Sequence, residues 1–143
     1  MGWSLLIQMA SPVRSSIIWC DSRAVSLGEN AFHKMGEEYC LSHFLNSPGN
    51  FTASKLKWVK EYEPEVYKRI YKIMLPGDYI AFKLSGEIVT SDTGLSEGIF
   101  WDYKNSDVAH ALLHHYGIDA ALLCLLLSQF FLFKEPSPRK QHP

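Results

Sequence analysis

The sequence predicts a helix-rich α/β domain with only a few short strands. Apolar residues recur at intervals of three and four positions along much of the chain, which is the spacing of helices with one buried face. Glycines and prolines divide these stretches at positions typical of helix ends and helix starts. With 143 residues, of which 47% are hydrophobic, the chain is long enough for one domain around one core.

The helices are predicted from their apolar faces and their boundary residues, in chain order. The first ends at Gly36, and a short helix at 37–45 precedes the turn "NSPGN". Pro64 and Pro76 each begin a further helix, because proline is favoured in the first helical turn. Ser106 is expected to cap the last helix. The predicted helices cover residues 24–36, 37–45, 52–62, 64–72, 77–85 and 106–116.

The spacing of apolar residues also predicts part of the core. Ala53, Leu56 and Val59 share one face of their predicted helix, so we expect them to be buried together. Strand composition is limited to two segments, residues 17–19 and the "EIVT" stretch at 87–90. The sequence therefore predicts little sheet.

The two ends of the chain differ from its centre. No Lys or Arg precedes "WSLLIQMA", so residues 1–10 make a poor secretory signal. Residues 120–133 carry no charge, but they are fewer than the roughly 20 residues that a membrane-spanning helix needs. We therefore expect a buried helix at 120–133, a disordered basic tail after it, no membrane span and a cytoplasmic location.

Composition and cysteine usage exclude some classes of function. The formal net charge of −1 provides no basic excess for binding nucleic acid. The cysteines Cys20, Cys40 and Cys124 are an odd number without a C-x-x-C pair. We therefore expect reduced thiols rather than a disulfide framework or a zinc site.

No cofactor-binding motif is visible. Neither G-x-x-x-x-G-K nor G-x-G-x-x-G occurs, so no phosphate-binding loop is predicted. The spacing of His110, His114 and His115 could place two imidazoles on one helix face, but Ala111 stands where a zinc-dependent protease has its Glu. We expect solvated histidines there, and neither a metal nor a cofactor in this chain.

Two stretches place polar groups where α/β folds bind ligands. In "WCDSR", Trp19, Asp21 and Arg23 lie at the end of the predicted strand 17–19, and such positions often contact ligands. Asp and Arg can hydrogen-bond sugar hydroxyls, and Trp offers a flat apolar wall. In "SPGNFTASKLKW", a tight turn presents Asn50. On the residues alone, an Asp–Arg pair capping the next helix and a plain loop before a helix are open alternatives.

Three motifs in order resemble the N-terminal domain of the FGGY carbohydrate kinases, and within that family most of all the xylulokinases. They are "IIWCDSRA", the segment from "NSPGNFTASKLKW" to "LPGDYIAFKLSGEI", and "TGLSEGIFWDY". The resemblance covers about residues 15–119 and leaves 1–14 and 120–143 unmatched. It implies a partial ribonuclease-H-like, actin-like ATPase domain. The implied reaction transfers the γ-phosphoryl of Mg-ATP to a pentulose, turning D-xylulose into D-xylulose 5-phosphate.

The resemblance also implies which residues bind the sugar. Trp19 matches the family's aromatic wall against the substrate, and Asn50 stands where relatives place a residue that reaches the sugar. Asp21 and Arg23 belong to the same motif and either touch the sugar or brace the loop. No residue matches the family's catalytic base, so no catalytic residue is assigned.

The sequence departs from the family in several motifs. The D-x-G-T and M-H-G motifs, the later G-D-N motif with the catalytic Asp, and the second, ATP-binding domain are absent. We therefore expect a fragment that is inactive alone. Binding of Mg-ATP, and the dimeric state common among full-length relatives, would belong to the complete enzyme. The alternative is a standalone, non-catalytic module that binds a sugar or a partner protein.

Overall fold

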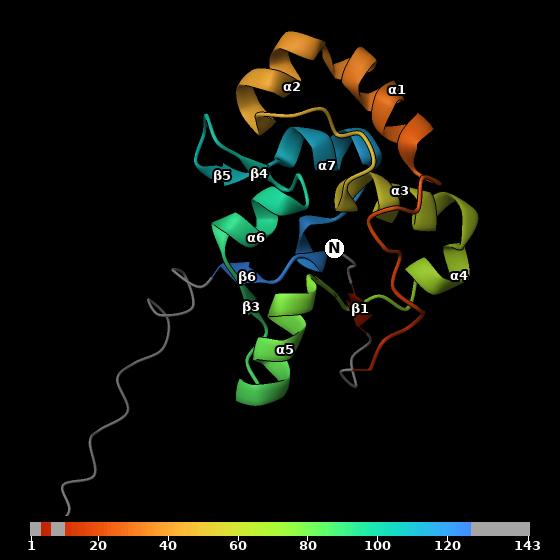
Figure 1. The fold of residues 1–143 in the computed structure, drawn as a ribbon, viewed down its shortest axis with the longest axis vertical. Coiled ribbons are helices and arrows are strands. Elements are labelled where there is room, and N and C mark those ends of the chain that lie inside the picture. Colours follow the sequence, from red (N-terminus) through yellow and green to blue (C-terminus); the bar gives the residue numbers. More distant parts are fainter. Residues whose placement is uncertain (1–3, 7–10, 127–143) are drawn as a thin grey trace, which may run out of the picture.

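The computed structural model describes residues 4–6 and 11–126 (Figure 1). The helices are α1 (Val25–Met35), α2 (Glu37–Phe44), α3 (Thr52–Tyr62), α4 (Pro64–Tyr67), α5 (Pro76–Ser85), α6 (Asp92–Glu97) and α7 (His110–Tyr116). The strands are β1 (Ser4–Leu6), β2 (Lys72–Met74), β3 (Val89–Thr90), β4 (Trp101–Asp102), β5 (Asp107–Val108) and β6 (Leu125–Leu126). A short 3-10 helix, η1 (Ala120–Leu122), precedes β6.

The helices pack into a cluster at one end of the molecule. α1 contacts α2, α3 and α7, and α3 also contacts α4. α5 packs against β2 and β3 and lies at the opposite end from α1 and α2 (Figure 1). The loop at 17–23 leads into α1, and the loop at 46–51 connects α2 to α3. Both candidate motifs are therefore loops held by the helical cluster.

The described strands form three two-stranded sheets. β1 is antiparallel to β2, and β3 is parallel to β6. An isolated parallel bridge between Ile73 of β2 and Leu123, two residues before β6, links the two pairs. β4 and β5 form a separate antiparallel hairpin with Trp101 opposite Val108. The described residues therefore contain little sheet, as the sequence predicted.

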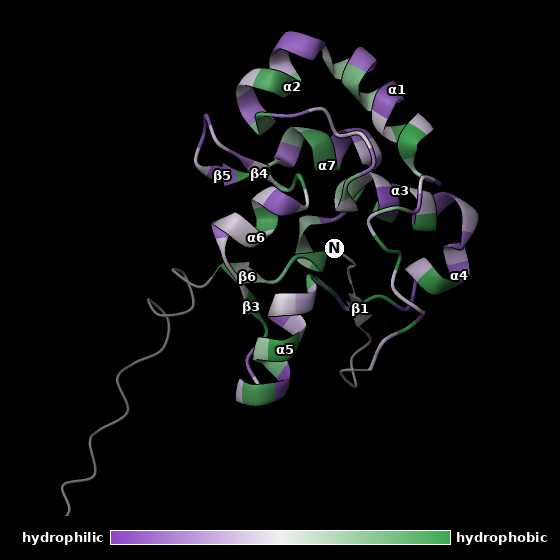
Figure 2. Ribbon diagram, in the orientation of Figure 1, coloured by the Kyte–Doolittle hydropathy of each residue, from purple (hydrophilic) through white to green (hydrophobic). Residues whose placement is uncertain are grey.

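The core forms around α3. Ala53, Leu56 and Val59 are fully buried, which confirms the predicted face of this helix. The ribbon of α5 carries hydrophobic colouring over several of its residues (Figure 2). In contrast to α3, α5 keeps apolar side chains in solvent, because Ile80 and Leu84 are 60% and 85% exposed. Within the described residues, no helix is long and apolar enough to cross a membrane.

Several predicted elements are confirmed. The helices expected at 24–36, 37–45, 52–62 and 77–85 correspond to α1, α2, α3 and α5. The strand expected within 87–90 is β3. These elements have local signals, namely an apolar face and a Gly or Pro at the boundary, so they could be read without tertiary context.

Two predictions around the candidate loops are wrong. The helix expected at 64–72 ends at Tyr67, and the chain continues into β2. Ile73 and Met74 are buried in β2, so pairing with neighbouring strands overrides the helical spacing. Residues 17–19 are not a strand either, because the chain turns there and the Asp21 N–H donates to the Ile18 carbonyl at 3.1 Å.

The C-terminal half holds three further corrections. Ser106 does not cap a helix at 106–116, because it adopts a φ of 51° between β4 and β5, and α7 begins only at His110. The sequence analysis missed α6, although Ser91 caps it by accepting the Gly94 N–H at 3.0 Å. The helix expected at 120–133 is not an α-helix over 120–126, because this part holds only the short 3-10 helix η1 followed by β6, which pairs with β3. Residues 127–133 lie outside the described residues.

One close backbone contact places the 46–51 loop against α1. Gly28 lies in α1 so near to Gly49 that a Cβ atom on Gly28 would be 1.9 Å from the Gly49 carbonyl oxygen. Real Cβ atoms do not approach other atoms this closely. The helix and the loop can therefore pack together only if position 28 has no side chain.

We predict that Gly28→Ala destabilises the chain by about 3 kcal/mol or prevents folding, because the methyl group forces α1 away from the loop. Gly77→Ala is the matched control, since Gly77 lies in α5 and a Cβ there has nothing within 4 Å. The control should be neutral or up to about 1 kcal/mol more stable. Urea unfolding followed by circular dichroism measures both variants. Equal stability of the two would contradict the contact.

Candidate functional site

The "WCDSR" loop brings Trp19 from the core boundary to the surface. Ile17 is buried and anchors the start of the loop, whereas the Trp19 side chain is 70% exposed only two positions later. The turn between them is closed by the bond from the Asp21 N–H to the Ile18 carbonyl. The indole therefore stands out from a short, anchored loop.

Asn50 joins the two candidate loops. Its side-chain Nδ2 donates to the carbonyl of Asp21 at 2.7 Å and to the carbonyl of Trp19 at 3.3 Å. The structure therefore brings together two motifs whose key residues are 31 positions apart. Both Nδ2 hydrogens are used in these bonds, and the buried Oδ1 has no hydrogen-bond partner. The Asn50 side chain therefore holds the backbone of the Trp19 loop through two hydrogen bonds.

Asp21 and Arg23 pair with each other. The Arg23 Nε lies 2.9 Å from both carboxylate oxygens, and Nη2 lies 2.6 Å from Oδ2. The Arg23 guanidinium also lies 4.5 Å from the centre of the Trp58 ring on α3. This pair braces the loop against α3. It does not cap α1, because the N-cap residue Ala24 has no side-chain cap bond.

The ion pair changes the acidity of Asp21. Hydrogen bonds from the Arg23 side chain and backbone lower the pKa of the Asp21 carboxyl from 3.8 to about 2. A lowered pKa means that folding favours the ionised form. The contribution of this pair to stability is therefore complete above pH 3.8 and is lost as the pH falls through about 2.

The sequence analysis missed Lys55, which lies beneath the same loop. Its side chain comes from α3, is only 3% exposed as a residue, and donates from Nζ to the Ile18 carbonyl at 2.8 Å. Burial lowers the pKa of this ammonium, and the charge on Asp21 opposes the shift. The sequence did contain a signal for the burial of Lys55. This residue lies four positions before Val59 and next to Leu56, which places it on the buried face of α3.

A second polar pair lies away from the loops. His43 of α2 places Nδ1 2.9 to 3.0 Å from both carboxylate oxygens of Asp102 in β4, and Tyr39 stacks on the His43 ring at 4.0 Å. Burial raises the pKa of Asp102, but hydrogen bonds from His43 and Asn105 outweigh burial, so the pKa is lowered. This pair ties α2 to the β4–β5 hairpin.

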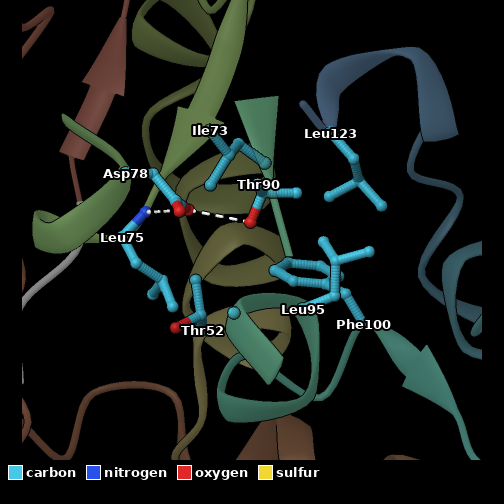
Figure 3. Close-up of a pocket in the computed structure, with 9 residues that line it drawn as sticks. Thr52, Ile73, Leu75, Asp78, Thr90, Leu95, Phe100 and Leu123 are labelled. Atoms are coloured by element: carbon cyan, nitrogen blue, oxygen red, sulfur yellow. Dashed lines mark hydrogen bonds between the residues drawn. The ribbon is translucent and has the colours of Figure 1, made fainter. Parts of the chain in front are cut away.

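A small cavity near α5 also has a carboxylate in its wall (Figure 3). The Asp78 Oδ2 accepts from the Thr90 hydroxyl at 2.9 Å and from the Leu75 N–H at 3.4 Å, and burial raises the pKa of Asp78. Apolar side chains form most of the remaining wall. The cavity volume, about 10 Å³ for the centre of a water molecule, gives room for about one water. The cavity is therefore too small for a sugar, and Asp78 serves to join α5 to β3.

The groups that could bind a metal are dispersed. Over residues 11–126, no three His, Cys, Asp or Glu side chains gather in a way that could hold a metal ion. Asp21 is already committed to Arg23, and His110 and His114 are exposed on α7. The Trp19 loop therefore offers an apolar wall and a braced backbone for binding.

Comparison with known proteins decides the family. The model of the FGGY family of carbohydrate kinases, N-terminal domain, matches residues 4–130. The chain belongs to the FGGY carbohydrate kinases. It is 34% identical over 122 residues to a xylulose kinase of Staphylococcus xylosus, covering 85% of this chain and 25% of that protein. It is 33% identical over 113 residues to a xylulose kinase of Escherichia coli K12, covering 78% and 23%.

The solved structures of FGGY kinases share the fold. The xylulose kinase of Rhodospirillum rubrum superimposes with a TM-score of 0.79 at 24% identity, covering 87% of this chain and 26% of that one. This likeness confirms the predicted fold class, a helix-rich, partial α/β domain of the actin-like ATPase type. The chain spans about a quarter of the length of these FGGY relatives.

We predict that the Asp21 carboxyl in this FGGY domain titrates with a midpoint near 2, as measured by carbon-detected NMR. Arg23→Gln should return the midpoint part of the way towards 3.8, because it removes the guanidinium hydrogen bonds that favour the carboxylate and leaves the bond from the backbone N–H of residue 23. Arg69→Gln is the control, since Arg69 is an exposed arginine outside the loop. A wild-type midpoint near 3.8 would show that Asp21 is not held by Arg23.

Proposed function

We propose that this chain forms the sugar-binding wall of a kinase that phosphorylates a pentulose, D-xylulose foremost. The observation that carries the proposal is the exposed Trp19 indole on a loop held by Asn50 and braced by the Asp21–Arg23 pair. A flat apolar ring suits the C–H face of a sugar. Support for the pentulose comes from the relatives, several of which are xylulose kinases.

In this proposal Trp19 contacts the sugar, and the other three predicted residues place it. Asn50 fixes the carbonyls on either side of the Trp19 turn, so the indole has a defined position before the sugar arrives. Arg23 keeps spare N–H donors at the edge of the loop that can reach a sugar hydroxyl. A wall that is already ordered binds with less loss of conformational entropy.

The phosphoryl-transfer chemistry is assigned to other parts of the family's chain. Transfer from Mg-ATP requires a catalytic base, a metal site and an adenine site, together with exact placement of the sugar hydroxyl. We propose that the chain alone binds the sugar weakly and does not phosphorylate it. A cytoplasmic location and a dimeric complete enzyme stay predictions from the family resemblance.

We predict that D-xylulose binds the isolated chain with a millimolar Kd, because stacking and single hydrogen bonds contribute only about 0.5–1.5 kcal/mol each. Saturation-transfer NMR measures this binding without relying on Trp emission. Trp19→Ala should abolish the signal. Tyr103→Ala, which removes an exposed aromatic ring from the segment between β4 and β5, should leave it unchanged.

Three outcomes would contradict the proposal. Binding that survives Trp19→Ala would show that the wall lies elsewhere, and equal binding of the aldose D-xylose would show that the surface does not select a ketose. Turnover of D-xylulose with Mg-ATP, followed by ADP release and lost in Trp19→Ala, would show that the chain is a complete enzyme.

A further inference from the structure

Lys55 is a buried charge that the proposed sugar contacts do not use. The residue is 3% exposed, and its α3 neighbours Ala53, Leu56 and Val59 are fully buried. Removing an ammonium from water is costly, so buried lysines are uncommon unless they have partners. In this structure the partner is a main-chain carbonyl, that of Ile18, at 2.8 Å. The charge is therefore directed at the loop that carries Trp19.

The ammonium complements the bonds made by Asn50. Lys55 holds the carbonyl of Ile18, and Asn50 holds the carbonyls of Trp19 and Asp21. The Ile18 carbonyl also closes the turn, since it accepts the Asp21 N–H. Two side chains from opposite ends of the 50–55 segment thus bind three carbonyls of one turn, and the Trp19 side chain is left exposed.

We propose that Lys55 is a positioning residue whose ammonium fixes the turn at residues 18–21 and so sets the direction of the Trp19 wall. The inference rests on the proposed sugar-binding function of Trp19 and deepens it. Hydrogen bonds from charged groups are stronger than neutral ones, which suits a loop that must stay ordered while exposed. The Asp21 carboxylate contributes attraction at longer range.

A purely structural role makes a different prediction. If Lys55 only fills space in the core, its aliphatic stem matters and its charge does not. Lys55→Met retains most of the stem and removes the ammonium. An apolar side chain at this buried position avoids the cost of removing a charge from water, which offsets the lost hydrogen bond, and the Ile18 carbonyl still accepts the Asp21 N–H. Loss of the charge can therefore be separated from loss of packing.

The test compares Lys55→Met with Lys57→Met in the full chain. Lys57 lies in the same helix but pairs with Glu61, away from the loop. Hydrogen exchange of the Asp21 amide, read by NMR, should become about tenfold faster in Lys55→Met and stay unchanged in Lys57→Met. The urea midpoint of Lys55→Met should be equal to or higher than that of the wild type. The D-xylulose Kd should rise at least severalfold.

Each result decides between the two roles. An unchanged Asp21 exchange rate overturns the positioning role, and so does a faster rate with an unchanged D-xylulose Kd. A fall in the urea midpoint with uniformly faster exchange across α3 assigns Lys55 to packing and also overturns it. If the wild type binds no D-xylulose, the proposed function fails, while faster exchange confined to residues 18–21 still supports the hold of Lys55 on the turn.

Discussion

The contact between Gly28 and Gly49 determines how closely α1 can approach the loop that carries Asn50. A single methyl group on Gly28 would collide with the Gly49 carbonyl. From the other side, the buried Ser54 of α3 donates to the Pro48 carbonyl at 3.1 Å. The 46–51 loop is thus fixed between two helices. Because it is fixed, the Asn50 amide can serve as a rigid support for the Trp19 loop.

The hydrogen bonds that hold the Trp19 loop differ in strength. Asn50 provides neutral hydrogen bonds to two carbonyls, and Lys55 provides a charged one to a third. At the rim, the Asp21–Arg23 pair is partly exposed and is screened by solvent, so it is expected to order the loop more than to stabilise the fold. The Trp19 loop thus has a rigid backbone and an exposed indole. This combination suits a surface that binds a small polar ligand.

Local signals in the sequence predicted part of this arrangement. The sequence alone was enough to predict the buried face of α3 and several helix ends. It also showed the two loop motifs and their order along the chain. Lys55 could not be recognised as easily, because lysine is usually solvated and its burial follows from the position of the loop above it. The roles of Asn50 and of the turn at Trp19 depend on contacts between residues about 30 positions apart. β2 and β6 form because they pair with distant strands, which spacing alone does not reveal.

The central claim is that Asn50 holds the Trp19 loop through its side-chain amide, and the most direct measurement is the NMR signal of that amide. The account predicts two distinct Nδ2 protons that exchange slowly with water and show nuclear Overhauser contacts to backbone protons of residues 19–22. Asn46, whose side-chain Oδ1 accepts the Ser47 N–H at 2.9 Å, provides an internal reference. Rapid exchange of the Asn50 protons, without contacts to residues 19–22, would contradict the account.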